Sequence, residues 1–272
     1  MSYLENVEAK RNLEKELQSS ESSKGVFRKK FDEDYIELIL MGDEHIGSPQ
    51  YKKDLHQKVL ESCYEKNRYM IHMGDGIEAA TRNSIGAGVY QQEEIIDKQM
   101  NEFRALYEPF VEKGLFIGGH PGNHELRVFN DEGLNLTRQM YRAMKARYFG
   151  IAKASVLRVG NQTYKIYSTH GSSGARLPYT KIKSALDMEK IIDVDIYAMA
   201  HVHQLMHHVR NYNVIDLKKT KIVTGSKHFI LTGSYLEFWD SYAQMKNMEP
   251  ARIGSPVVKL YGDEKRIKVS LQ

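Results

Sequence analysis

The 272-residue chain has the composition of an ordinary globular protein, with 41% hydrophobic and 27% charged residues. Its 39 basic and 35 acidic residues give a net charge of +4, which neither requires nor excludes a nucleic-acid partner. A single cysteine, Cys63, excludes an intramolecular disulfide and a zinc site built from cysteines. The charged N-terminus lacks the apolar segment of a secretory signal, and no apolar run approaches the roughly 20 residues that cross a bilayer. We therefore expect a cytoplasmic protein that is not bound to a membrane.

The sequence predicts a charged N-terminal arm and linker, residues 1–30, followed by one domain, residues 31–272. In the first part of the domain, strand-like runs alternate with stretches of helical periodicity, whereas the chain beyond residue 204 consists mostly of short strand-like runs. This order favours a mixed sheet system with helices outside it. The predicted strands are 35–41, 69–73, 115–118, 155–159, 163–168 and 195–200, and the predicted helices are 51–66, 91–112, 132–147 and 180–192.

A polar cluster follows each of five predicted strands at the point where the strand ends. Because strand carboxyl ends gather on one edge of a sheet with crossover connections, we expect these clusters to converge. An Asp-x-His or His-x-His motif on an extended segment would also place both of its side chains on the same side. The clusters supply, in chain order, Asp43 and His45, Asp75 and Glu78, Asn123 and His124, His170, and His201 and His203.

These residue types indicate a metal site. Oxygen and imidazole ligands without thiolate suit Mn²⁺, Fe, Zn²⁺ or Ni²⁺. The groups are too many for one tetrahedral ion, but they suit two ions that share a carboxylate. Two ions about 3.5–4 Å apart can hold a hydroxide between them and clamp a phosphoryl group during in-line attack. Each motif alone is equally compatible with an ordinary polar turn, but five in order, each ending a strand, are hard to reconcile with independent turns.

The same motifs, in the same order, resemble those of the calcineurin-like metallophosphoesterase superfamily over roughly residues 35–205. The motifs are Asp-x-His (43–45), Gly-Asp (74–75), Gly-Asn-His-Glu (122–125), His-Gly (170–171) and x-His-x-His (200–203). The last motif begins with Ala200, where the family usually has glycine. The amino-acid sequence around the first three motifs is also similar to that of phage and prophage-encoded phosphoesterases. The resemblance implies a four-layer α/β/β/α sandwich, in which two mixed β-sheets are flanked by helices.

The resemblance further implies two divalent metal ions with one shared carboxylate, and we expect Mn²⁺, with Fe, Zn²⁺ or Ni²⁺ as alternatives. The first ion would be held by Asp43, His45, Asp75 and His203. The second would be held by Asp75, Asn123, His170 and His201, so that Asp75 bridges the pair.

His124 has no metal in this scheme and would act as a general acid toward the leaving oxygen, a task that suits imidazole near neutral pH. The resemblance places Glu78 where its carboxylate can pair with His124 and raise the pKa of the imidazole. Arg127 and Arg176 lie close in sequence to the site loops and are candidates for binding substrate phosphate. A solvated surface arginine is the alternative for both.

Two further segments have open interpretations. The glycine-rich loop 82–89 would either reach over the site or serve as an ordinary connection. Tyr235, Trp239 and Tyr242 would either stack a base or, more commonly for such a cluster, belong to the core or an oligomer contact.

The function expected is hydrolysis of phosphoester bonds by a metal-bridged hydroxide. The preferred substrate is a phosphodiester of nucleic acid or a nucleotide, cleaved in the host cytoplasm if the chain is phage-encoded. A phosphomonoesterase acting on a nucleotide, a phosphoprotein or a small molecule is the alternative. A non-catalytic scaffold with this fold is a third reading, but every ligand position and His124 are filled, which disfavours it.

Overall fold

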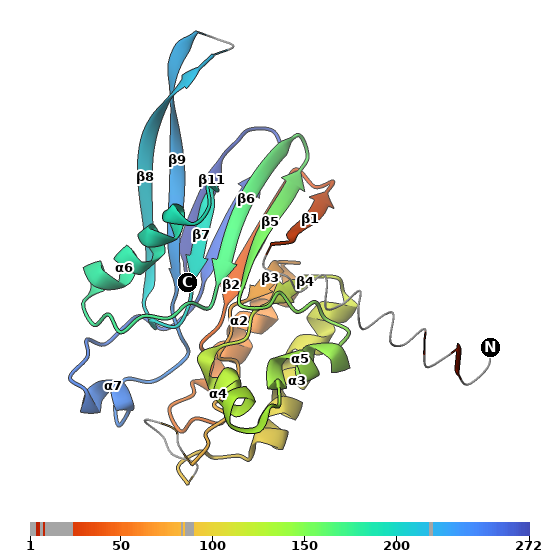
Figure 1. The fold of residues 1–272 in the computed structure, drawn as a ribbon, viewed down its shortest axis with the longest axis vertical. Helices are drawn as coiled ribbons and strands as arrows, with labels where there is room; N and C mark the ends of the chain where they lie inside the picture. Colours follow the sequence, from red (N-terminus) through yellow and green to blue (C-terminus); the bar gives the residue numbers. More distant parts are fainter. Residues whose placement is uncertain (1–3, 6–7, 9–23, 83, 85–89, 218–219) are drawn as a thin grey trace.

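The computed structural model describes residues 4, 5, 8, 24–82, 84, 90–217 and 220–272, and it contains two β-sheets packed face to face (Figure 1). Helices cover the outer face of each sheet, so the predicted four-layer α/β/β/α sandwich is confirmed. Most of the predicted N-terminal arm and most of the loop 82–89 lie outside the described residues. No helix in the described ranges combines the length and the apolar character that a membrane span requires.

The five-stranded sheet has the order β11-β10-β2-β3-β4. Its centre is parallel, because helical crossovers connect the three strands that carry the first site motifs. The two C-terminal strands join it in antiparallel fashion. The strands are β2 (Tyr35–Met41), β3 (Tyr69–His72), β4 (Phe116–Gly119), β10 (Pro256–Tyr261) and β11 (Ile267–Leu271), and the crossover helices are α2 (Lys53–Glu65) and α3 (Ile96–Glu112).

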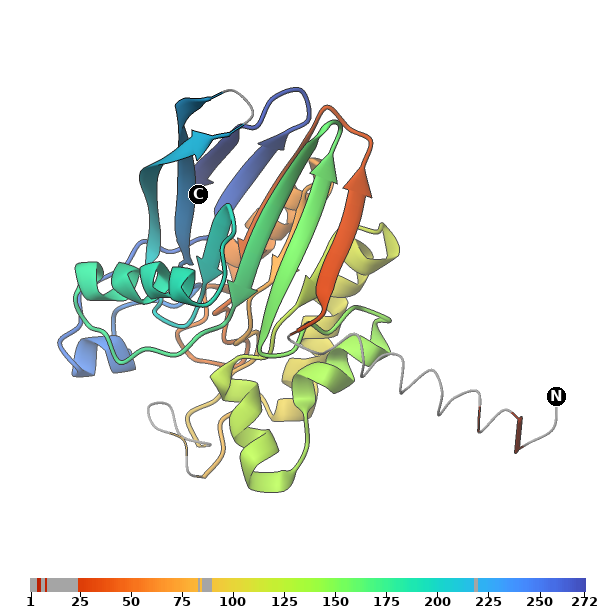
Figure 2. The ribbon, with the colours of Figure 1, turned by 45° about the horizontal axis from the view of Figure 1, so that its top comes forward.

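The six-stranded sheet has the order β1-β5-β6-β7-β9-β8 and mixes parallel with antiparallel pairs (Figure 2). β6, β7 and β9 run parallel, so their carboxyl ends share one edge. The strands are β1 (Val26–Phe31), β5 (Ala152–Val159), β6 (Gln162–Thr169), β7 (Ile196–Met199), β8 (Leu205–Asp216) and β9 (Lys221–Thr232).

The apolar run of β2 is buried on both faces, which is why it contains almost no polar residue. Leu38 and Leu40 face the other sheet, where they join Ile166 and Ile196 in the core between the sheets. The alternate residues of β2 pack against α2 and α3 in a second cluster. On the far side, α6 (Pro178–Asp187) and the short 3₁₀ helix Met188–Lys190 cover the six-stranded sheet.

Several elements differ from the sequence-based expectation. The predicted helix 132–147 is the shorter α5 (Leu136–Ala143). A helix that was not predicted, α4 (Asn123–Glu132), precedes it and ends where Gly133 takes a left-handed conformation with φ of 72°. The chain beyond residue 204 contains two twelve-residue strands, β8 and β9, which pair as a long hairpin that projects from the sheet (Figure 1). A short helix, α7 (Tyr242–Met245), follows them.

Residues 26–30, which the sequence analysis grouped with the arm, form most of β1. This strand pairs in parallel with β5 at the edge of the six-stranded sheet. Its three consecutive basic residues hide the strand pattern, but charged side chains are common on edge strands because they discourage pairing with other chains.

Candidate metal centre

The carboxyl ends of β2, β3, β4, β6 and β7 meet at one edge of the sandwich, and backbone hydrogen bonds connect the loops that leave them. The amide of Asp43 donates to the carbonyl of Gly74 at 2.9 Å, and the amide of His45 donates to the carbonyl of Asp75 at 3.0 Å. The amide of His201 donates to the Asp43 carboxylate at 2.9 Å, which links the two sheets. Backbone hydrogen bonds alone therefore hold the loop after β2 beside the loop after β3.

The backbone at these exits is left-handed, not extended, which corrects the expected basis of the Asp-x-His and His-x-His geometry. Among the described residues, eleven that are not glycine have positive φ, and five of these are predicted ligands. Asparagine, aspartate and histidine tolerate this region better than other residues, and strained backbone of this kind is concentrated at functional sites. The five ligands are Asp43 (φ 55°), His45 (53°), Asp75 (53°), His201 (70°) and His203 (49°).

A first group of possible metal ligands contains Asp43, His45 and His203, whose ligand atoms all lie within 4.8 Å of one another. The Nε2 atoms of His45 and His203 are 3.2 Å apart, and His203 Nε2 is 3.5 Å from Asp43 Oδ1. His45 Nδ1 lies 3.2 Å from a Glu78 oxygen, which can only accept, so Nδ1 donates there and Nε2 presents its lone pair to the group. Asp43 Oδ1 is buried without a hydrogen-bond partner among the described residues. Buried lone pairs that face one another in this way suit a cation.

A second group contains Asp75, His170 and His201, and Asn123 lies among them. Asn123 Oδ1 is 3.0 Å from His170 Nε2 and 2.6 Å from His201 Nδ1. His170 Nδ1 donates to the carbonyl of Met73 at 2.9 Å, so Nε2 is the ring atom that faces the Asp75 carboxylate 3.3 Å away and that a cation could use once its proton is lost. This group, too, brings carboxylate, amide and imidazole ligand atoms within reach of one cation.

The two groups meet at Asp75. Its Oδ2 atom is 3.3 Å from His170 Nε2 in the second group and 3.9 Å from His45 Nε2 in the first. Carboxylate, amide and imidazole donors arranged in this way fit two divalent cations that share one carboxylate. The structure therefore places all seven predicted ligands together, in the two sets that the resemblance implies.

His124 and Glu78 lie beside the first group and form a third cluster with His45. His124 Nδ1 is 2.9 Å from the Glu78 carbonyl oxygen and 3.4 Å from a Glu78 carboxylate oxygen. Since a carbonyl only accepts, Nδ1 carries a proton, and Nε2 lies 4.0 Å from the Asp75 carboxylate. Glu78 thus contacts both a predicted ligand and the predicted general acid.

The charges of the cluster shift the pKa values of its members. Burial would raise the pKa of the Asp75 carboxyl, but His170 and His124 hold it well below its usual range. Burial would lower the pKa of His170, but Asp75 raises it to about 10. Burial also opposes charge on His124, yet Asp75 and Glu78 raise its pKa above the ordinary value. In the absence of a cation, protons on these imidazoles balance the carboxylates, and a bound cation would take their place.

Glu125 holds the site loops together, a role that the sequence did not predict. Its buried carboxylate accepts hydrogen bonds from the amides of Gly122 (2.8 Å), Gly76 (2.8 Å) and Asp75 (3.2 Å). It therefore ties the turn after β4 to the turn after β3. A Cβ on Gly122 would lie 1.9 Å from Asp75 Oδ1, so only glycine allows this approach. A glutamate at the third position of a helix, after a turn, is a capping signal that could have revealed this role.

A buried hydrogen-bond network around Glu44 lies behind the site and was not predicted from the sequence. Glu44, between two predicted ligands, turns into the core, where its carboxylate accepts from the Tyr107 hydroxyl at 2.6 Å and lies 3.1 Å from His72 Nε2. The Tyr141 hydroxyl lies 2.9 Å from His72 Nδ1 and continues the network. This buried network fixes the exits of β2 and β3 relative to α3 and α5. No sequence pattern indicates the direction in which Glu44 points.

The remaining residues singled out in the sequence lie in different surroundings. Arg127 lies one turn after His124 on α4 and donates to the Ser84 hydroxyl. Arg176 is exposed, and no contact between it and a ligand residue occurs in the described ranges. Tyr235 is buried in the core and donates to Ser255, whereas Trp239 is 65% exposed, so these two do not form one stacking surface. The side chain of Tyr242 lies outside the described set.

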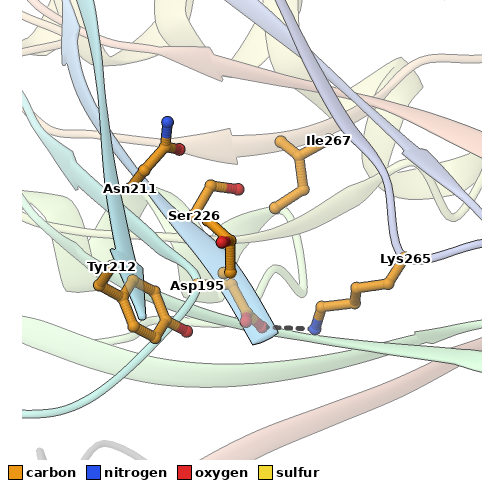
Figure 3. Close-up of a pocket in the computed structure, with 8 residues that line it drawn as sticks. Asp195, Asn211, Tyr212, Ser226, Lys265 and Ile267 are labelled. Carbon is orange, nitrogen blue, oxygen red and sulfur yellow. Dashed lines mark hydrogen bonds and ion pairs between the residues drawn. The ribbon is translucent and has the colours of Figure 1, made fainter. Parts of the chain in front are cut away.

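A cavity of about 440 Å³ lies between the start of β7, the β8–β9 hairpin and the N-terminal end of β11 (Figure 3). It is lined by Asp195, which precedes β7, by Tyr212 and Ser226 of the hairpin, and by Lys265. Asp195 and Lys265 form an ion pair at 2.8 Å across it. None of the predicted ligands lines this cavity, so it is separate from the metal centre.

Neither models of protein families nor curated proteins match the sequence. Among solved structures, the chain is similar to a conserved uncharacterized protein from Streptococcus pneumoniae, described as a predicted phosphoesterase. The two chains share 13% sequence identity with a TM-score of 0.35, over 88% of this chain and 98% of the other. A likeness this weak assigns neither a family nor an activity, so a function must be inferred from the centre itself.

Proposed function

We propose that this protein hydrolyses phosphoester bonds in a reaction that requires two divalent cations. The observation that carries the proposal is the pair of groups of possible metal ligands that meet at Asp75, with a buried Asp43 oxygen that lacks a hydrogen-bond partner among the described residues. Asp43, His45, Asp75 and His203 would hold one cation, and Asp75, Asn123, His170 and His201 would hold the other.

The balance of charge supports an anionic substrate. Asp43 and Asp75 are the carboxylates of the two ligand groups, while Glu78 is paired with two imidazoles. Two carboxylates offset about half of the charge of two divalent cations, and the remainder would attract a phosphate group. When bound, such a pair of cations activates water and polarises phosphoryl oxygens.

His124 is placed to supply a proton to the leaving oxygen. Its Nδ1 proton is directed at Glu78, which fixes the ring and leaves Nε2 as the atom that a substrate can reach. The nearby carboxylates raise its pKa, so the charged, donating form persists closer to neutral pH. An alkoxide is a poor leaving group unless it is protonated as it departs. Proton donation by His124 should therefore accelerate cleavage of alkyl phosphoesters more than cleavage of nitrophenyl esters.

Within phosphoesters we prefer a phosphodiester of nucleic acid or a nucleotide. A monoester carries a second negative charge on the phosphate, and recognition of it is favoured by several cationic side chains. In the described part of the chain, Arg127 is the only predicted arginine near His124, and it already donates to Ser84. Phosphomonoester hydrolysis is the alternative that the experiment must separate.

The test compares two chromogenic substrates after metal removal and reloading. Protein stripped with a chelator and reloaded with Mn²⁺ should bind about two ions per chain and cleave bis-p-nitrophenyl phosphate faster than p-nitrophenyl phosphate. Asp75→Ala should lose both the metal and the activity, whereas Asp187→Asn, at an exposed ion pair on α6, should keep both. Cleavage of the monoester alone would favour the phosphomonoesterase, and bound metal without turnover of either compound would favour a scaffold.

A further inference from the structure

Lys181 has an unusual environment for a lysine. It lies in the first turn of α6, and only 6% of it is exposed. Its ammonium makes one hydrogen bond within the described ranges, a long one of 3.5 Å to the side-chain oxygen of Gln204. No carboxylate of the described residues lies at ion-pair distance from it. A buried ammonium without a counter-ion is unfavourable unless an anion is supplied from elsewhere.

Lys227 is another buried lysine in the same protein, and its ammonium has counter-ions. It is 8% exposed, and its ammonium pairs with Asp193 and, at 2.9 Å, with Glu189. Lys181 lacks any such pair, and its nearest acidic influence is the exposed Glu249. Burial lowers the pKa of Lys181, which is the direction expected for an ammonium that lacks a partner.

The position of Lys181 connects it to the metal centre. Gln204, which it contacts, directly follows His203, one of the predicted ligands. The helix that carries Lys181 begins eight residues after His170 and covers the end of the sheet from which the ligand loops emerge. The N-terminus of a helix also favours negative charge. An anion near Lys181 would therefore lie next to the loop that carries His201 and His203.

We propose that Lys181 and Gln204 form a second anion subsite beside the metal centre, which binds a phosphate of the substrate adjacent to the phosphoester that is cleaved. This inference rests on the proposed function and narrows its substrate class. The preferred substrates would carry at least two phosphate groups, either neighbouring phosphodiesters of a strand or the phosphodiester and terminal phosphate of a nucleotide. The ammonium would bind one phosphate by charge, and the amide nitrogen of Gln204 would donate to it.

The experiment compares two substrates that differ by one phosphate, using the Mn²⁺-loaded full chain. Thymidine 5′-(p-nitrophenyl phosphate) carries one phosphate, and its 3′-phosphorylated form carries two. The wild-type protein should prefer the second in kcat/KM, and Lys181→Met should reduce that preference about 10-fold, mainly through KM. Lys181→Arg should retain part of it. A p-nitrophenyl ester of a thymidine dinucleotide, with an internal second phosphate, distinguishes a strand from a nucleotide with a terminal phosphate.

Lys183→Met is the matched control, because Lys183 lies on the same helix but is exposed and paired with Asp187 at 2.6 Å. It should leave the preference unchanged. An equal loss on both substrates in Lys181→Met, or no preference in the wild type, would overturn the subsite while leaving the proposed function intact. If the wild type cleaves neither substrate although it binds metal, the proposed function and the subsite both fail. The melting temperature of each variant shows that a change in preference is not caused by unfolding.

Discussion

At the edge where the ligand loops emerge, polar side chains are buried and the backbone is left-handed, whereas along the β8–β9 hairpin apolar side chains are exposed and the backbone is regular. Ile215 and Ile222 face each other near the tip of the hairpin, and each is 71% exposed. At the loop edge, in contrast, buried polar atoms are held by partners from distant segments, as in the bonds from Gly76 to Glu125, from His124 to Glu78 and from His170 to Met73. Both regions belong to the same two-sheet sandwich, so the fold itself does not explain the difference.

The comparison indicates where the molecule can tolerate change. The hairpin depends on its own ladder of backbone hydrogen bonds, and a side chain that is mostly exposed contributes little to it. The loop edge depends on mutual contacts among distant segments, so loss of one member leaves several buried groups without partners. The following four predictions test this contrast, beginning with the largest expected effect.

Glu125→Ala should lower the free energy of unfolding by roughly 4 kcal/mol, because several buried amides would lose their common acceptor. The measurement is urea denaturation at neutral pH. Glu132→Ala, at the exposed end of the same helix, should change stability by less than about 0.5 kcal/mol. Equal stability of the two variants would contradict the role assigned to Glu125.

His124→Ala should keep the metal content of the wild type and lose activity by roughly 10²–10³-fold toward esters with poor leaving groups. The loss should be much smaller for p-nitrophenyl esters, since their leaving group needs little protonation. Steady-state rates on the two kinds of ester provide the measurement. An unchanged ratio between them would remove His124 from the proton transfer.

His120 tests the contrast through pH. Burial lowers its pKa to about 3. Its Nδ1 atom is 2.8 Å from the Gly150 carbonyl oxygen, and its Nε2 atom is 2.8 Å from the Ser168 hydroxyl. Below pH about 6.5 the unfolded chain binds a proton on this ring, whereas the folded chain does not. The contribution of His120 to the free energy of unfolding is therefore present at neutral pH and is lost as the pH falls from about 6.5 toward 3. Between pH 7 and 5 the wild type should therefore lose about 2 kcal/mol more than His120→Asn. Parallel pH profiles for the two proteins would refute this.

Ile222→Thr should have the smallest effect, below about 0.5 kcal/mol, because the side chain is mostly exposed and threonine suits a strand. Denaturation and turnover of the diester should both match the wild type. A loss above about 2 kcal/mol would show that the tip of the hairpin contributes to the stability of the whole domain.

Much of the fold could be predicted because the strands that lead to the site are apolar runs bounded by turn residues. β2 matches the predicted range, β3 ends one residue earlier than predicted, and β4 is shifted by one residue toward the C-terminus. β1 was not predicted because its basic residues resemble a linker. α4 was not predicted, and the predicted helix 132–147 started too early because periodicity does not reveal that Gly133 is left-handed and separates α4 from α5.

The grouping of the predicted site residues agrees with the structure, although their roles remain predictions. Strand exits could be located from the sequence, and parallel strands bring such exits together. The left-handed backbone at Asp43 and His45 could not be foreseen, because it accompanies hydrogen bonds to a loop that is distant in sequence. The same holds for Glu44 and Glu125, which turn away from solvent toward partners on other elements.

The predicted ligands are divided between the two layers of the sandwich. Asp43, Asp75 and Asn123 follow strands of one sheet, and His170 and His201 follow strands of the other. Cations held by this set would connect the two sheets at the edge where the ligand loops emerge. The melting temperature of the protein should then rise with the concentration of free Mn²⁺, and a chelator should lower it.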